Sequence, residues 1–309
     1  MLHSFTSIAQ SNLPYIDFDQ SMQINKHQHL LKSENIAYLL NFFKTLYTKN
    51  NFLNIKPNAS LKIPKLIHQI WLGGKLPAEY HDFRASWIYH HPNWQFIFWT
   101  DSTLNYDQGA VVDSFATLEK ALKNNVKFIV VDIKSILFDN RIFFDKATNY
   151  GESSDILKWE IVYRFGGLYV DTDYECLKPL DQLHYMYDFY TGIVPLDTNF
   201  SQLGAALYGA TPGHPIMQQC VLGIKDNQHI AQIVIKTGPI HFTKSFCKAA
   251  MDQQHQINIA LPASYFYPCG YEQRGQPQQI WHKPEAFAVH HWAGSWLKPS
   301  GFLHKNRAS

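Results

Sequence analysis

Two aspartates one residue apart, Asp171 and Asp173, follow directly after a short apolar stretch at residues 167–170. In an extended chain, residues two apart point to the same side, so these two carboxylates face the same way. Burying both charges without compensation would cost several kcal/mol. Carboxylate oxygens are ligands that Mg²⁺ and Mn²⁺ prefer, and these ions also bind diphosphate oxygens. The pair therefore predicts a site for a divalent cation and a diphosphate; the plainer interpretation is two acids that cap turns beside a surface loop.

Three other uses of paired acids fit less well. A phosphatase of the haloacid-dehalogenase type has Thr or Val two residues after the second aspartate, where this chain has Glu175. A calcium loop needs further ligands and a glycine, which residues 174–177 do not supply. A retaining glycosidase needs two well-separated carboxylates that flank a sugar, and no second candidate stands out. Glycosyl transfer explains the pattern best.

A predicted helix precedes this strand. Ser154 is a good N-cap, and Asp155 then falls in the first turn. Helical spacing puts Asp155, Lys158 and Trp159 on a face different from the apolar stripe. The stripe consists of Leu157, Ile161, Val162 and Phe165. Two glycines, at 166–167, end the helix before the strand begins.

The chain before this helix alternates between strands and helices. Apolar runs at 66–71 and 94–99 predict strands, and a helical stretch lies around 78–90 between them. This alternation predicts an α/β fold with a mostly parallel sheet. Ligands of such sheets bind at the carboxyl ends of the strands, where Trp71 and Asp101 lie. Past about residue 200 the chain looks irregular, with several turn signals.

Residues 1–60 differ in composition from the rest, being rich in Asn, Gln, His and Lys. Apolar residues at helical spacing predict one amphipathic helix within residues 33–47. Those residues are Ile36, Leu39, Leu40, Phe43 and Tyr47. The helix either packs on the main body or forms a surface for a membrane or a partner. A linker at 48–60 then divides the chain into a helical extension, 1–60, and a main domain, 61–309.

Composition excludes several classes of protein. The net charge of +2 and the absence of a Lys/Arg-rich stretch argue against nucleic-acid binding. The four cysteines stand far apart, which excludes a Cys-x-x-Cys metal or redox motif and favours a reducing compartment. No signal peptide and no apolar run long enough to span a membrane are evident. We therefore expect a cytoplasmic protein, or one delivered into a host cell by a route that needs no signal peptide.

Three segments resemble glycosyltransferase family 32, whose sugar-binding region contains a DXD motif. The central segment runs from Ser154 to Asp173 and combines Ser-Asp-Ile-Leu-Lys with Gly-Gly-Leu-Tyr-Val-Asp-Thr-Asp. Residues 67–74 resemble the first strand of that family, and residues 291–296 resemble its carboxyl-terminal metal and phosphate motif. The same segments are similar to the glucosyltransferase domain of the large clostridial cytotoxins and related bacterial effectors.

This resemblance implies a GT-A fold, which is a Rossmann-like, mostly parallel sheet flanked by helices. It also implies a nucleotide-sugar donor such as UDP-glucose, a divalent metal (Mn²⁺ or Mg²⁺) and retention of the anomeric configuration. The chain would then be a hexosyltransferase that moves a hexose or N-acetylhexosamine to a protein or glycan acceptor.

The resemblance also implies roles for individual residues. Trp71 would stack on the nucleobase, and Asp155 would hydrogen-bond hydroxyls of the ribose or the transferred sugar. Asp171 would contact the ribose and metal-bound water, and Asp173 would bind the metal directly. These three aspartates form the expected catalytic set. Tyr169 either reaches the sugar or packs beneath it.

Two positions depart from the family pattern. Lys158 stands where the family usually has Arg, and lysine cannot reproduce the planar fork of a guanidinium. Lys158 therefore either contacts the donor or is a solvated surface residue. In the tail, His291 stands where the toxin group has an acidic metal ligand, and we favour it over His290 as the metal ligand. Trp296 would donate a hydrogen bond to a phosphate oxygen.

The sequence leaves the identity of the acceptor undecided. Residues 204–215 and 237–240 resemble family loops that wall the acceptor cleft, or are ordinary turns. The helical extension favours a bacterial effector with a targeting module, which could contact a membrane peripherally. A second hypothesis is a nucleotide-sugar or glycan-binding module with impaired catalysis.

Overall fold

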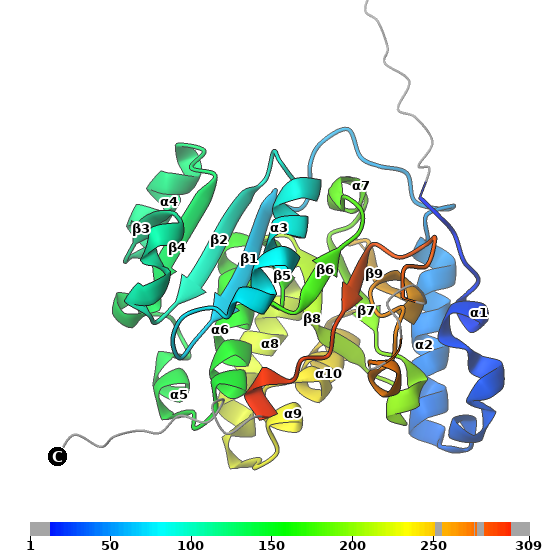
Figure 1. Ribbon diagram of the computed structural model, residues 1–309. Coiled ribbons are helices and arrows are strands. Elements are labelled where there is room, and N and C mark those ends of the chain that lie inside the picture. Colours follow the sequence, from blue (N-terminus) through cyan, green and yellow to red (C-terminus); the bar gives the residue numbers. More distant parts are fainter. Residues whose placement is uncertain (1–12, 251–254, 275, 277–280, 298–309) are drawn as a thin grey trace, which may run out of the picture.

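The computed structural model describes residues 13–250, 255–274, 276 and 281–297. Within them, eight strands form one sheet in the order β3-β4-β2-β1-β5-β8-β7-β9 (Figure 1). Its strands are β1 Leu66–Trp71, β2 Gln95–Thr100, β3 Ala110–Val112, β4 Phe128–Asp132, β5 Gly167–Val170, β7 Phe189–Ile193, β8 Leu203–Ala210 and β9 Asn258–Leu261. All neighbouring pairs are parallel except those that β8 makes with β5 and β7. The predicted α/β class with a mostly parallel sheet is confirmed.

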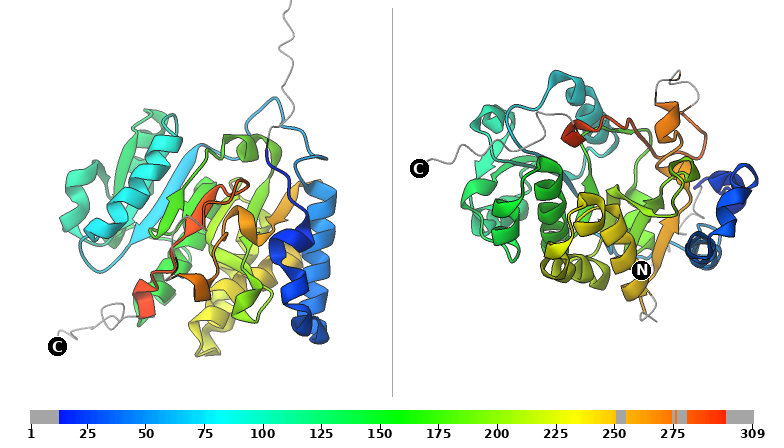
Figure 2. Two further views of the ribbon diagram at one scale, coloured as in Figure 1. Left: turned by 45° about the vertical axis from the view of Figure 1, so that its right-hand side comes forward. Right: turned by 90° about the horizontal axis from the view of Figure 1, so that it is seen from below.

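The helices of the described chain are α1 Phe18–Met22, α2 Glu34–Asn50, α3 His81–His90, α4 Phe115–Lys123, α5 Arg141–Lys146, α6 Tyr150–Phe165, α7 Asp181–Met186, α8 Pro215–Asp226, α9 Ile233–Lys236 and α10 Pro239–Ala250. Helix α8 packs against both α6 and α10, and α6 and α10 also contact the sheet. A small second sheet pairs β6, Tyr174–Cys176, with β10, Ala288–His290. It packs against α3, on the side of the main sheet away from α8 and α10 (Figure 2). None of the helices described here has the length and apolarity needed to cross a membrane.

Helix α6 begins earlier than the sequence predicts. Asn149 is the N-cap, and its side chain accepts a hydrogen bond of 2.7 Å from the Gly151 N–H. Ser154, the predicted cap, lies inside the helix. The helix is longer than predicted because it is buried on most of its circumference, including Lys158 and Trp159. Packing against the sheet and α8 therefore stabilises an additional turn that local patterning does not indicate.

Strand β8 corrects the view that the chain is irregular past residue 200. Residues 204–210, which resembled an acceptor loop, form a fully buried strand in the middle of the sheet. The small residues of β8 permit close approach of aromatic rings. A Cβ at Gly209 would lie 2.4 Å from the Tyr190 ring, and one at Gly204 would overlap Tyr267. Alanine and glycine have weak strand propensity, so packing rather than local preference makes this segment a strand.

The predicted amphipathic helix is α2, and it packs on the body of the protein. It contacts the edge strand β9, where the Asn50 side chain donates to the Asn258 carbonyl over 2.8 Å. Phe43 packs against Phe246 of α10 with ring centroids 6.1 Å apart. Apolar residues of α1 and α2 belong to the same hydrophobic core as the sheet. The extension therefore covers the edge strand β9, whose backbone could otherwise pair with a strand of another molecule.

The start of β5 generates a stability prediction. Gly167 has φ of +96°, and an added Cβ would lie 2.9 Å from the Leu66 carbonyl oxygen of β1. We expect Gly167→Ala to lower the free energy of unfolding by about 3 kcal/mol, since backbone strain and a backbone clash combine. Gly213, with φ of +70° and nothing within 4 Å of its Cβ position, is the matched control. Gly213→Ala should cost about 1 kcal/mol in urea unfolding; equal losses would contradict the steric explanation.

Candidate functional site

The Asp-x-Asp pair occupies the turn between β5 and β6. The Asp171 N–H donates to the Ala206 carbonyl of β8 over 2.8 Å, which fixes where β5 ends. Strand β10 then pairs with β6 so that His290 lies opposite Tyr174. As a result, ligand atoms of Asp171, Asp173 and His290 all lie within 4.8 Å of one another. Two segments that are distant in sequence, the β5–β6 turn and strand β10, thus converge at one point.

Asp173 is only 9% exposed and has partners on both carboxylate oxygens. The Ala293 N–H donates to Oδ2 over 2.9 Å, and His290 Nε2 lies 3.3 Å from Oδ1. Burial would raise the pKa of Asp173, but His290 and the Ala293 N–H outweigh it and lower the pKa. The carboxylate is therefore held in its charged form by the C-terminal segment.

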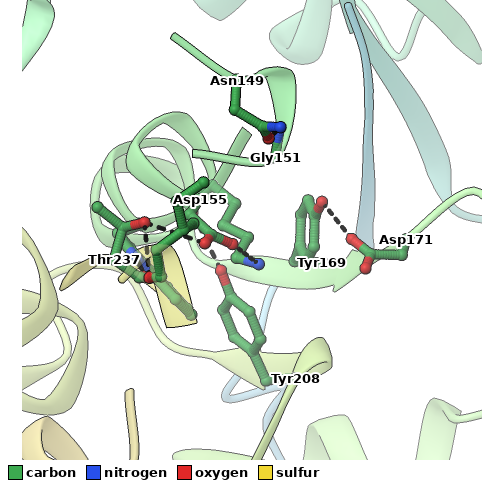
Figure 3. Close-up of polar contacts among 10 residues, drawn as sticks. Asn149, Gly151, Asp155, Tyr169, Asp171, Tyr208 and Thr237 are labelled. Carbon is green, nitrogen blue, oxygen red and sulfur yellow. Dashed lines mark hydrogen bonds and ion pairs between the residues drawn. The ribbon is translucent and has the colours of Figure 1, made fainter. Parts of the chain in front are cut away.

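Asp171 has a different environment. The Tyr169 hydroxyl donates to Asp171 Oδ1 over 2.6 Å (Figure 3). Burial raises the pKa of Asp171; Lys158 opposes this shift and Asp173 adds to it. Like charges at close range disfavour ionisation of both groups, and a bound cation relieves that repulsion. Two carboxylates and one imidazole are a donor set that Mn²⁺ accepts, and Mg²⁺ tolerates the oxygen ligands.

The structure brings His290, and not His291, to the aspartates. His291 Nε2 lies 3.1 Å from Glu175 Oε2, and the His291 ring stacks on Phe83 with centroids 4.1 Å apart. The two histidines diverge because successive residues of an extended chain point to opposite faces. The sequence preference for His291 depended on alignment with a motif, and only the β6–β10 register shows which histidine faces Asp173.

A second polar cluster surrounds Asp155 on α6. Lys158 Nζ lies 2.5 Å from Asp155 Oδ1, and the Thr237 hydroxyl donates to Asp155 Oδ2 over 3.1 Å (Figure 3). Lys158 is 3% exposed, and its ammonium lies over the rings of Trp159 and Tyr169. The interpretation of Lys158 as a solvated surface residue is therefore wrong. Sequence reasoning did not identify Thr237 as a partner of Asp155, although its Thr-Gly-Pro segment was singled out.

Trp71 and Trp296, the two tryptophans predicted to bind the nucleotide, lie in β1 and beside the start of α6. Trp71 is half-buried at the carboxyl end of β1, with its ring centroid 5.2 Å from that of Tyr80. Trp296 lies against the start of α6, where the Asn149 side chain donates to the Trp296 carbonyl over 2.9 Å. The C-terminal segment therefore extends from the aspartates to the first turn of α6, where Gly151 also lies against the Trp296 side chain. The roles of both tryptophans toward a nucleotide stay predictions.

Comparison with known proteins agrees with this site. Residues 77–190 match the family described as "Glycosyltransferase sugar-binding region containing DXD motif". The match includes Asp155, Asp171 and Asp173 but stops before His290. Residues 77–190 are thus similar to the sugar-binding region of glycosyltransferases, and the Asp-x-Asp turn within them matches the motif that this description names.

Individual relatives are distant. Inositol phosphoceramide mannosyltransferase 3 of Schizosaccharomyces pombe is 24% identical over 279 residues, which cover 84% of this chain and 68% of that protein. Human alpha-1,4-N-acetylglucosaminyltransferase is 24% identical over 226 residues, covering 65% of this chain and 63% of that protein. The solved structure of PaToxG Glycosyltransferase is 16% identical with a TM-score of 0.47, and the likeness covers 72% of this chain and 79% of that one. A structural likeness this distant carries no inference about substrates.

The buried ion pair generates a prediction for Lys158. Lys158→Met leaves the Asp155 carboxylate in place without its cation, so we expect a loss of about 3–5 kcal/mol in the free energy of unfolding. The double variant Asp155→Asn/Lys158→Met removes both charges and should recover most of that loss. Urea unfolding of wild type, both single variants and the double variant measures the coupling. Strictly additive losses would show that the two side chains do not interact.

The different partners of the adjacent residues His290 and His291 lead to a prediction on metal binding. We expect His290→Ala to weaken Mn²⁺ binding by about 100-fold or more, because even outer partners of metal ligands contribute 10- to 100-fold. His291→Ala, which removes a partner of Glu175, should weaken it by about 10-fold or less. Isothermal titration calorimetry with Mn²⁺ alone measures both variants. A larger loss of Mn²⁺ affinity in His291→Ala would instead favour His291 as the metal ligand.

Proposed function

We propose that this chain is a metal-dependent, retaining glycosyltransferase that takes a hexose or N-acetylhexosamine from a UDP-sugar. The observation that carries the proposal is that Asp171 and Asp173, both within the matched sugar-binding region, lie within 4.8 Å of His290. Relatives named as mannosyl- and N-acetylglucosaminyltransferases support the class of transferred sugar. The choice of UDP and the retention of configuration depend on the sequence resemblance.

Asp171, Asp173 and His290 would hold the divalent cation. When bound, that cation supplies a Lewis acid that neutralises the negative charge of the departing diphosphate. Lowered pKa and buried partners keep Asp173 ionised, so this ligand needs no deprotonation before it binds. The His290 nitrogen that pairs with Asp173 must in turn be free of its proton to bind the cation.

Asp155, Lys158 and Tyr169 would position the donor sugar. Asp155 keeps both oxygens oriented by Lys158 and Thr237, so it presents a fixed acceptor for sugar hydroxyls. A carboxylate held near the anomeric carbon also favours the positive charge that develops there as the bond to the diphosphate breaks. Preorganisation of this kind costs no rearrangement during the reaction. We propose that the acceptor hydroxyl attacks from the face that the diphosphate leaves, with the departing phosphate taking its proton.

Donor hydrolysis tests the proposal without knowledge of the acceptor. Purified protein with Mn²⁺ should slowly hydrolyse at least one of UDP-glucose, UDP-N-acetylglucosamine, UDP-galactose and GDP-mannose, and EDTA should abolish this. Asp173→Asn should lower the rate at least about 100-fold, as expected for the loss of a group that stabilises transition-state charge. Release of the nucleoside diphosphate measures each reaction.

Glu119→Gln is the matched control, because Glu119 forms an exposed pair with Arg164 over 2.9 Å. This variant should hydrolyse the donor at the wild-type rate. If wild type binds a nucleotide sugar but turns over none, the impaired binding module becomes the better hypothesis. If Asp173→Asn is as active as wild type, the proposed metal site is wrong.

A further inference from the structure

A cavity of about 200 Å³ lies between the N-terminal extension and the segment that follows β9. Residues of α1, of the segment after β7 and of residues 263–273 line it. Its volume is below the roughly 300–1,000 Å³ typical of pockets for drug-sized ligands. The cavity therefore suits one small ring and is too small for a nucleotide sugar.

The lining mixes apolar surface with charged groups. Met22, Leu196 and Tyr267 supply apolar walls, while Asp197 and Lys283 supply a carboxylate and an ammonium. A pyranose has the matching character, because its C–H faces are apolar and its hydroxyl groups both donate and accept hydrogen bonds. A simple anion or cation would need one sign of charge to dominate, and here both signs are present.

Asp197 has unused hydrogen-bonding capacity. Its Oδ1 is buried without a hydrogen-bond partner of good geometry, and its Oδ2 accepts a long bond of 3.4 Å from the Glu272 N–H. The carboxylate lies directly on Gly270, where an added Cβ would come within 1.9 Å of Oδ2. Buried polar atoms usually have partners, and leaving one without costs about 1–3 kcal/mol. A ligand hydroxyl in the cavity would give this carboxylate a further hydrogen bond, shorter than the one from Glu272.

Tyr267 connects this cavity to the metal-ligand cluster. Its ring lines the cavity and also contacts His290 and Trp292, with centroids 5.7 Å apart in both cases. One aromatic ring thus lies between the cavity and a proposed metal ligand. The donor-binding candidates Asp155 and Trp296 lie on and beside α6, an element that does not line the cavity.

The N-terminal extension forms a wall of the cavity through direct contacts. Ser21 Oγ lies 2.7 Å from Ser264 Oγ and accepts a hydrogen bond of 3.0 Å from the Ser264 N–H. The Ala263 N–H points to the Met22 sulfur over 3.2 Å. These contacts are buried, so the docked extension and the cavity form together.

We propose that this cavity is a saccharide subsite, in which Asp197 accepts and Lys283 donates hydrogen bonds to hydroxyl groups of one pyranose ring. The inference rests on the proposed glycosyl transfer and specifies its acceptor class as a glycan. One sugar ring of that glycan occupies the cavity, while another ring receives the transferred sugar near the metal.

Saturation-transfer NMR with four simple probes tests the subsite. The probes are the methyl glycosides of α-glucose, α-mannose, β-galactose and N-acetyl-β-glucosamine, each titrated into the full chain at millimolar concentrations. We expect at least one to bind wild type, and Asp197→Asn to weaken it by about tenfold or more, the equivalent of one hydrogen bond to a charged group. Glu119→Gln removes an exposed carboxylate outside the cavity and should leave binding unchanged.

Thermal unfolding of the same variants separates a binding role from a structural one. Asp197→Asn should unfold at the wild-type temperature or above, because it removes a buried charge that lacks a full set of partners. Binding of none of the four glycosides, binding that survives Asp197→Asn, or a clearly lower unfolding temperature would each overturn the subsite. Donor hydrolysis by wild type is measured in parallel. Its absence would tell against the proposed function, whereas glycoside binding reports on the subsite alone.

Discussion

The burial of the Asp173 carboxylate at the end of a core strand constrains the rest of the site. A charge with so little exposure is tolerated only when other groups compensate it. The compensation comes from the far end of the chain, through the His290 imidazole and the Ala293 N–H. The antiparallel pairing of β10 with β6 brings the C-terminal segment next to Asp173, so that both groups reach the carboxylate. The C-terminal segment is therefore part of the site and not an appendage to it.

A second buried charge, on Lys158, has a related effect at the other side of the site. Its pairing with Asp155 and its position over two aromatic rings tie α6 to β5 by electrostatics as well as by packing. Lysine cannot form the bidentate contacts of the arginine that the family usually has. Here the lysine instead reaches one carboxylate oxygen while Thr237 reaches the other. The two polar clusters meet through Tyr169, which lies under the Lys158 ammonium and donates to Asp171.

Elements with strong local patterns were predictable from the sequence. The strand at 66–71 and the helix within 33–47 have clear apolar periodicity, and both are present as β1 and α2. The Asp-x-Asp turn was also predictable, because a pair of acids after an apolar strand has few explanations. Strand β8 was not, since its alanines and glycines carry little strand propensity and depend on the rings of Tyr190 and Tyr267. The cap of α6 at Asn149 was missed for a similar reason, because packing lengthens the helix beyond the cap that the local sequence favours.

The sequence by itself determined the class of fold, the position of the two neighbouring carboxylates and their suitability for binding a divalent cation. These properties depend on residue type and on spacing along one segment, and both can be read directly from the chain. Only the tertiary structure decided that His290 faces Asp173, that Lys158 is buried and that the N-terminal extension walls a cavity beside Tyr267. Each of these depends on strand register or on the docking of distant segments, and a shift of one residue would turn every side chain of a strand to its other face.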